Sequence, residues 1–93
     1  MLAKLFTIIE DRKANPIPGS YTNRLMDEGE DAILKKVGEE AMEVILAAKN
    51  QGDQRLVEEI ADLYYHTLVL LSSRDLNLAD IEMELSNRHK SRP

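Results

Sequence analysis

The sequence predicts an all-α protein, a helical bundle of four to five helices that is completed by dimerisation. Three observations support this fold class. Apolar residues recur at helical spacing through most of the chain, no stretch alternates like a strand over a convincing length, and residues 60–71 are apolar on nearly every side. Because the chain has 93 residues and no internal repeat or linker, we expect residues 1–93 to form a single domain.

The first part of the chain predicts two helices with a loop between them. Residues 2–14 are expected to form an amphipathic packing helix, on the apolar spacing of Leu2, Leu5, Phe6, Ile8 and Ile9. Two prolines and a glycine in residues 16–19 then stop any helix. A hydroxyl cap at Ser20 or Thr22 begins a short second helix, which Gly29 ends.

Residues 20–24 are rich in hydrogen-bond donors, and two interpretations of them stay open. A capped short helix accounts for these residues as well as contacts with a phosphate or a sugar do. Under the second interpretation, the candidate substrate-binding residues are Ser20, Tyr21, Thr22 and Arg24.

A third helix is expected over residues 30–49. Its core face would consist of Ile33, Val37, Ala41, Val44, Ile45 and Ala48. Two cations, Lys35 and Lys36, lie one turn before acidic residues at the edge of that face. They either offset charge through pairs such as Lys36 with Glu40, or hold phosphate oxygens of a substrate.

A short turn is expected to fold the third and fourth helices into an antiparallel hairpin. Gly52 predicts the end of one helix, and Asp53 predicts the start of the next, which would cover residues 54–73. The apolar residues 60–71 predict that this helix is buried. One chain of this size cannot easily cover such a helix, so we expect a homodimer formed through a helix-bundle interface.

A last helix is expected to begin at Asn77, a good N-cap with Asp80 three residues on. It would turn three apolar residues towards the core, namely Leu78, Ile81 and Leu85. Its basic end contains Arg88 and His89. Cations at a helix C-terminus are commonly only partners of the helix dipole, and substrate binding by Arg88 is the alternative.

The composition excludes several classes of protein. Without cysteine the chain has no disulfide, zinc–thiolate site or thiol catalysis, which fits a reducing compartment. A net charge of −5 argues against a general nucleic-acid binder. The N-terminal residues have too short an apolar run and too many charges for a signal peptide or a membrane span. We therefore expect a cytoplasmic protein with no nucleic-acid or membrane partner.

Two pairs of carboxylates predict a metal site. Residues three apart lie on one face of a helix, so Glu40 and Glu43 form one pair, and Glu59 and Asp62 form another. Counted from Gly52 at about 1.5 Å of rise per residue, the two pairs fall within roughly one turn of the same height. The hairpin is therefore expected to bring all four carboxylates together.

Four carboxylates in one cleft repel one another unless a cation neutralises them, and an all-oxygen ligand set suits Mg²⁺ or Mn²⁺. For either pair alone, a solvated acidic helix face is the simpler interpretation. The fourth helix favours the metal, because Glu59, Asp62 and His66 share one stripe of an otherwise apolar helix. A buried acidic stripe is seldom left unpaired.

The motif EExxE at Glu39, Glu40 and Glu43, followed by ExxD at Glu59 and Asp62, resembles the all-α nucleotide pyrophosphatase superfamily, often called MazG-like. More narrowly, the chain is similar to the phosphoribosyl-ATP pyrophosphatase family of histidine biosynthesis. The stretches that carry this likeness are RK-x-N-P at 12–16, GSYT at 19–22, KKVGEEAMEVILAAK at 35–49, ADLYYH at 61–66 and the terminal ELSNRHK.

The resemblance implies Mg²⁺-dependent hydrolysis of phosphoribosyl-ATP to phosphoribosyl-AMP and pyrophosphate by an obligate dimer. The metal ligands of the family map onto Glu40, Glu43, Glu59 and Asp62. The expected mechanism is metal-assisted attack of water at a phosphorus of the α–β phosphoanhydride, with Glu39 or Glu40 helping to take the proton.

Two alternatives remain open at this point. A house-cleaning nucleoside triphosphate pyrophosphatase of the same superfamily would share the metal site but prefer free or damaged nucleotides. A non-enzymatic acidic helical dimerisation module would release no pyrophosphate in the presence of metal.

Overall fold

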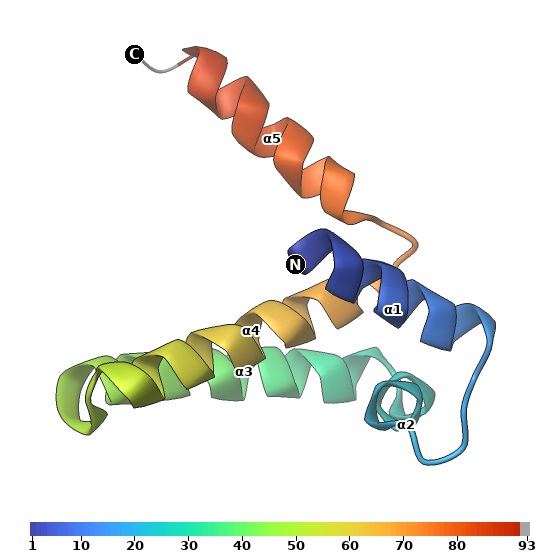
Figure 1. Ribbon diagram of the computed structural model, residues 1–93, viewed down its shortest axis with the longest axis horizontal. Helices are drawn as coiled ribbons and strands as arrows, with labels where there is room; N and C mark the ends of the chain where they lie inside the picture. Colours follow the sequence, from blue (N-terminus) through green and yellow to red (C-terminus); the bar gives the residue numbers. More distant parts are fainter. Residues whose placement is uncertain (92–93) are drawn as a thin grey trace.

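A computed structural model describes residues 1–91, which form helices joined by short connections (Figure 1). The helices are α1 (Leu2–Ala14), α2 (Tyr21–Glu28), α3 (Glu30–Leu46), α4 (Asp53–Ser73) and α5 (Leu78–Ser91), and a short π-helical turn η1 (Ala47–Gln51) follows α3. No strand occurs within this range. The all-α class and the expected order of helices are therefore confirmed.

The predicted helix caps are present as hydrogen bonds. The Ser20 hydroxyl accepts from the Asn23 backbone N–H at 3.2 Å, so Ser20 is the N-cap of α2 and Thr22 lies inside the helix. Asn77 and Asp80 cap each other, because each backbone N–H donates to the other side chain, at 2.9 and 3.2 Å. These residues begin α2 and α5 where the sequence predicted.

A glycine with positive φ stands between α2 and α3, and another stands directly before α4. Gly29, with φ of 100°, is the one residue between α2 and α3, and Gly52, with φ of 86°, directly precedes α4. The end of the third helix differs from the expectation, because the α-helical hydrogen-bond pattern stops at Leu46 and widens into η1. The chain then reverses, and α3 and α4 lie side by side in antiparallel directions (Figure 1).

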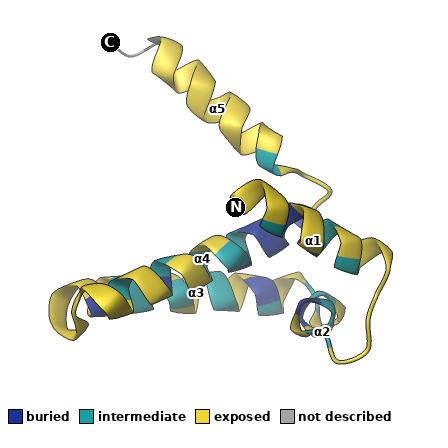
Figure 2. Cartoon of the chain, in the orientation of Figure 1, coloured by how far each residue is buried: buried dark blue, intermediate teal, exposed yellow. Residues whose placement is uncertain are grey.

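The core lies where α1 and α2 cover one end of the hairpin. Its buried residues come from four helices and are Phe6, Ile9, Leu25, Ile33, Leu68 and Val69. A polar contact joins α1 to the end of α4, because the Lys13 Nζ donates to the Ser72 carbonyl at 2.6 Å and to Asp75 at 2.7 Å. Figure 2 shows dark blue positions gathered where these helices meet, with mostly yellow, exposed positions along α5.

Several positions expected to face the core are exposed in the single chain. On α3, Ile33 is buried, but Ala41 and Ile45 are exposed, and 54% of Ile45 is accessible. Ala48, in η1, is exposed as well. The expectation was wrong for one chain because α1 and α2 do not extend over the turn end of the hairpin (Figure 1). Tyr64 of α4 is likewise 50% exposed, so α4 is not buried on every side.

The prediction for the last helix was also wrong in part. Leu78 is half-buried, whereas Ile81 and Leu85 are 43% and 60% exposed. The reason is the direction of α5, which extends away from the other helices after its first turn (Figure 1). In residues 1–91 no helix combines the length and apolar character that a membrane span requires.

Candidate metal and substrate site

Three of the four predicted carboxylates meet at the hairpin. Glu40 of α3 and Glu59 and Asp62 of α4 each offer one carboxylate oxygen, and these atoms lie within 4.8 Å of one another. Glu59 is buried, Glu40 is half-buried and Asp62 is exposed. The antiparallel hairpin positions this group, hereafter the acidic cluster, because the α4 residues three apart both face the turn of α3 that carries Glu40.

Glu43 does not join the acidic cluster. It is half-buried, one turn nearer the hairpin connection than Glu40. Residues three apart in a helix differ by about 60° around its axis, so two acids of one pair need not face the same point. The height of the residues above the turn was therefore a good guide for Glu40 but not for Glu43, whose role as a ligand stays a prediction.

The donor set of the acidic cluster fits a hard divalent cation. All of its donors are carboxylate oxygens, which Mg²⁺ and Mn²⁺ prefer. Burial raises the pKa of the Glu40 carboxyl, and Glu59 and Asp62 raise it further. Like charges held this close destabilise the ionised state unless a cation is near.

A cation of the chain already contacts one member of the acidic cluster. The Arg55 guanidinium donates to Glu59 Oε1 and to Glu58 Oε1, each at 2.5 Å. Glu59 has only 7% of its side chain exposed, so this ion pair compensates a charge that water reaches poorly. Arg55 was not predicted, although its spacing of four residues from Glu59 could have indicated the pair.

Lys36 and Glu39 lie beside the acidic cluster rather than in it. The Lys36 Nζ is 4.0 Å from Glu39 Oε1, so the measured ion pair joins Lys36 to Glu39 instead of to the expected Glu40. The charge of Lys36 still acts on Glu40, whose carboxyl pKa it lowers in opposition to the larger effects of burial and the other acids. Lys35 and Glu39 are exposed, and Glu39 is outside the cluster.

Hydrogen bonds connect the first turn of α2 to α4 at the acidic cluster. The Tyr21 hydroxyl is 3.0 Å from His66 Nε2, and the Thr22 hydroxyl bonds with that of Tyr65. On its other side, His66 Nδ1 is 2.9 Å from the Asp62 carbonyl and 3.7 Å from Glu40 Oε1. His66 and Tyr65 were not predicted as site residues, because their partners on α2 are more than 40 positions away in the sequence.

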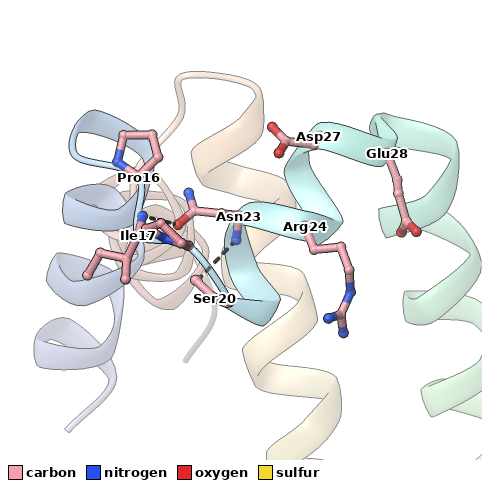
Figure 3. Close-up of a pocket in the computed structure, with 9 residues that line it drawn as sticks. Pro16, Ile17, Ser20, Asn23, Arg24, Asp27 and Glu28 are labelled. Atoms are coloured by element: carbon pink, nitrogen blue, oxygen red, sulfur yellow. Dashed lines mark hydrogen bonds between the residues drawn. The ribbon is translucent and has the colours of Figure 1, made fainter.

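A cavity of about 530 Å³ lies beside α2 on the side of the proline-containing loop (Figure 3). Asn23 holds this loop in place, since its side chain accepts from the Ile17 N–H at 2.9 Å and donates to the Arg12 carbonyl at 2.7 Å. Arg24 lines the cavity, and its guanidinium also stacks over the Tyr21 ring at 5.2 Å. Arg24 therefore lies between the cavity and the residues next to the acidic cluster.

Arg88 is remote from these residues within one chain. It lies in the last turn of α5, and its Nε donates to Glu84 Oε1 at 3.0 Å. Figure 1 shows that this end of α5 is far from the α3–α4 hairpin. The structure therefore joins Tyr21 and Thr22 to the α4 residues next to the acidic cluster, and it places Arg24 over the Tyr21 ring. Ser20 lines the cavity, and Arg88 is separate from all of them (Figure 1).

The sequence of the chain is similar to that of known proteins along almost its whole length. Residues 2–89 match the family described as phosphoribosyl-ATP pyrophosphohydrolase. The chain is 56% identical over 90 residues to a phosphoribosyl-ATP pyrophosphatase of Clostridium acetobutylicum, an alignment that covers 97% of this chain and 82% of that protein. It is 53% identical to the protein of the same name from Clostridium botulinum, with the same coverage.

A longer protein also contains a similar region. The chain is 49% identical over 89 residues to the histidine biosynthesis bifunctional protein HisIE of Gloeobacter violaceus. That alignment covers 96% of this chain but 40% of the longer protein. The region shared by these relatives therefore includes the hairpin, the acidic cluster and α2.

Proposed function

Because the chain belongs to the phosphoribosyl-ATP pyrophosphohydrolase family, of the MazG-like all-α superfamily, we propose that it hydrolyses phosphoribosyl-ATP to phosphoribosyl-AMP and pyrophosphate in histidine biosynthesis. The observation that carries this proposal is the acidic cluster of Glu40, Glu59 and Asp62, held by the hairpin of a chain that matches the family along residues 2–89. The family match favours this substrate over the free or damaged nucleotides of a house-cleaning enzyme.

The acidic cluster would hold a divalent cation, for which we propose Mg²⁺, with Mn²⁺ as a substitute. Glu43, one turn along α3, would support it from outside the cluster or complete it. When bound, such an ion neutralises charge on phosphate oxygens and makes water easier to deprotonate.

We assign the proton acceptor to Glu39. Glu40 contributes an oxygen to the acidic cluster, whereas Glu39 lies outside it, is exposed and has Lys36 beside it. A carboxylate that is not engaged by the cluster can take the proton of a water that attacks the α–β phosphoanhydride. Glu40 is the alternative acceptor, and replacing Glu39 by Gln distinguishes the two.

Arg24, Lys35 and Lys36 would hold phosphate oxygens of the substrate. Arg24 can do so as a two-pronged donor and the lysines as point charges. The Ser20 hydroxyl only accepts in the cap of α2, so its own hydrogen can donate to a phosphate oxygen, whereas the Thr22 hydroxyl bonds with that of Tyr65. Arg88 could reach a substrate only from a second copy of the chain.

A second copy would also cover the exposed apolar residues of the hairpin. Three large ones near the turn, Met42, Ile45 and Val57, are 54–62% exposed. A groove of about 790 Å³ between α1, α4 and α5 adds further apolar surface. We propose that the protein is a homodimer in which these surfaces are buried. We place it in the cytoplasm, the compartment that suits a cysteine-free biosynthetic enzyme.

The test is pyrophosphate release from phosphoribosyl-ATP with Mg²⁺ and with EDTA, and from dUTP as the competing substrate. We expect metal-dependent release from phosphoribosyl-ATP and much slower release from dUTP. Faster turnover of dUTP would support the house-cleaning function instead. If neither substrate yields pyrophosphate with metal, the acidic cluster does not serve this reaction.

A further inference from the structure

A buried imidazole next to the acidic cluster has hydrogen bonds on both of its nitrogens. His66 is 6% exposed, and it lies between the Tyr21 hydroxyl of α2 and the Asp62 carbonyl of its own helix. It contributes no oxygen to a cation, and nothing in the hydrolysis proposed above requires it. Its two contacts nevertheless join the element that carries Arg24 to the element that carries Glu59 and Asp62.

The partners of His66 determine which ring nitrogen carries hydrogen. A backbone carbonyl can only accept a hydrogen bond, so Nδ1 donates to Asp62. In the neutral ring Nε2 is then the acceptor, and the Tyr21 hydroxyl donates to it over 3.0 Å. The single hydrogen of the Tyr21 hydroxyl is therefore used within the protein, which argues against the expectation that Tyr21 binds substrate through this group.

The same contacts dock the first turn of α2 at two neighbouring points of α4. The Tyr21 hydroxyl bonds with His66, and the hydroxyl of the next residue, Thr22, bonds with that of Tyr65. The Tyr65 and His66 rings stack edge to face, with centroids 5.1 Å apart. Two adjacent side chains on each helix thus set the register of α2 along α4.

The ring of Tyr21 also contacts Arg24, so the packing of α2 on α4 affects where Arg24 lies. The Arg24 guanidinium lies over the Tyr21 ring at 5.2 Å. In Figure 3 the Arg24 side chain extends away from Asp27 at the far end of α2. A cation held on a ring that is itself hydrogen-bonded beside the acidic cluster has a defined position relative to the three carboxylates.

We propose that the Tyr21–His66 hydrogen bond positions the Arg24 guanidinium relative to the acidic cluster, so that phosphate oxygens of a nucleotide meet the cation and the carboxylates together. Tyr21 and His66 are then positioning residues, and Arg24 is the residue that touches substrate. The inference rests on the proposed hydrolysis of phosphoribosyl-ATP. It adds specificity for a correctly placed phosphate chain, which a mobile arginine would not give.

The experiment is a double-mutant cycle on pyrophosphate release. Tyr21→Phe removes the hydroxyl but keeps the ring under Arg24, and Arg24→Gln removes the cation. We expect Tyr21→Phe to lower kcat/KM roughly tenfold, and we expect Arg24→Gln to cost several-fold less in the Tyr21→Phe background than in the wild type. Tyr64→Phe is the matched control and should leave turnover unchanged, because Tyr64 lines the groove between α1, α4 and α5 and not the cavity beside α2.

Two amide variants of His66 test the direction of the hydrogen bond. Gln carries its amide near the place of Nε2 and can accept from Tyr21, whereas Asn carries it near the place of Nδ1 and cannot reach Tyr21. His66→Gln should therefore retain more activity than His66→Asn. Binding of Mn²⁺ to the Tyr21→Phe variant, measured by electron paramagnetic resonance, should match the wild type, because the carboxylates are intact.

The outcomes separate this inference from the function on which it rests. An active wild type with additive costs of the two substitutions, or with full turnover after Tyr21→Phe, overturns the inference alone. Mn²⁺ affinity that falls in parallel with turnover also overturns it, since Tyr21 would then act on the acidic cluster and not through Arg24. A wild type that releases no pyrophosphate overturns the proposed function and the inference together.

Discussion

At the scale of single residues, the contrast between Glu40 and Glu43 has a direct consequence. Both belong to the EExxE motif, but only Glu40 lies within 4.8 Å of Glu59 and Asp62 through a carboxylate oxygen. A residue that offers an oxygen to the cluster is needed in place, whereas Glu43, one turn along α3, would act on the cluster through its neighbours. Although Glu40 and Glu43 carry the same side chain, we therefore expect their substitution to have unequal effects.

Isosteric amides test this difference. Glu40→Gln, Glu59→Gln and Asp62→Asn should each lower kcat by roughly 100-fold or more, and Glu43→Gln by about an order of magnitude less. Pyrophosphate release at saturating Mg²⁺ measures the effect, and circular dichroism verifies that each variant is folded. An effect of Glu43→Gln equal to the others would mean that Glu43 is a full ligand.

The ion pair between Arg55 and Glu59 is expected to weaken the binding of a metal ion and the stabilisation that it gives. Its guanidinium occupies Glu59, so it competes with a cation for this carboxylate, and it also compensates the buried charge when no cation is present. Arg55→Gln should therefore bind Mn²⁺ more tightly, and Mg²⁺ should raise its Tm by several degrees more than that of the wild type. Arg55→Lys is the control that keeps the charge. A smaller gain in the Gln variant than in the wild type would contradict the competition.

At the scale of elements, the hairpin depends on a backbone conformation that only glycine adopts easily. Gly52 has φ of 86° and no atom within 4 Å of the place where a Cβ would stand, so strain alone opposes a side chain there. Gly38 also has an open Cβ position but lies inside α3. The same substitution is therefore expected to have opposite signs at the two glycines.

Gly52→Ala should reduce the free energy of unfolding by about 1–2 kcal/mol, and Gly38→Ala should increase it by roughly 0.5–1 kcal/mol. Urea denaturation followed by circular dichroism provides both values. Destabilisation by Gly38→Ala would indicate that another surface occupies the space beside this part of α3.

Contacts between residues that are close in the sequence could be predicted, whereas contacts that depend on how the helices pack could not. The caps at Ser20 and at Asn77 with Asp80 were predicted correctly, because both partners lie within three residues. The meeting of Glu40 with the α4 acids followed from helical spacing and one short turn. The bond between Tyr21 and His66 could not be predicted, because it joins residues 45 positions apart and depends on the packing of α2.

At the scale of the whole molecule, large apolar side chains are exposed at positions where the sequence pattern predicts core residues. Ile45 and Leu85 have the periodicity of core residues, yet 54% and 60% of each is accessible. Periodicity identifies a face that must be buried but does not specify whether the same chain or another buries it. The sequence therefore predicted faces that the single chain leaves exposed, and their burial by a second copy stays a prediction.

Ile45→Asp tests this interpretation. If a second copy covers the hairpin, the new charge would be buried without a partner at a cost of several kcal/mol, so the variant should be monomeric where the wild type is dimeric. Sedimentation equilibrium at micromolar concentration distinguishes the two states, and Ile45→Leu should remain a dimer. A wild type that sediments as a monomer would refute the homodimer.

Because Gly29 is the single residue between α2 and α3, insertions and deletions at this point would alter how the two helices are oriented. The Gly29 N–H donates to the Met26 carbonyl, and its own carbonyl accepts from the Ile33 N–H, so Gly29 serves both helices. One inserted helical residue would turn α2 by about 100° relative to α3 and carry Arg24 away from Glu40. Residues 15–19, by contrast, form an exposed loop, although the Asn23 side chain fixes this loop at Ile17. Insertions and deletions should thus be excluded directly after α2, where no loop separates it from α3.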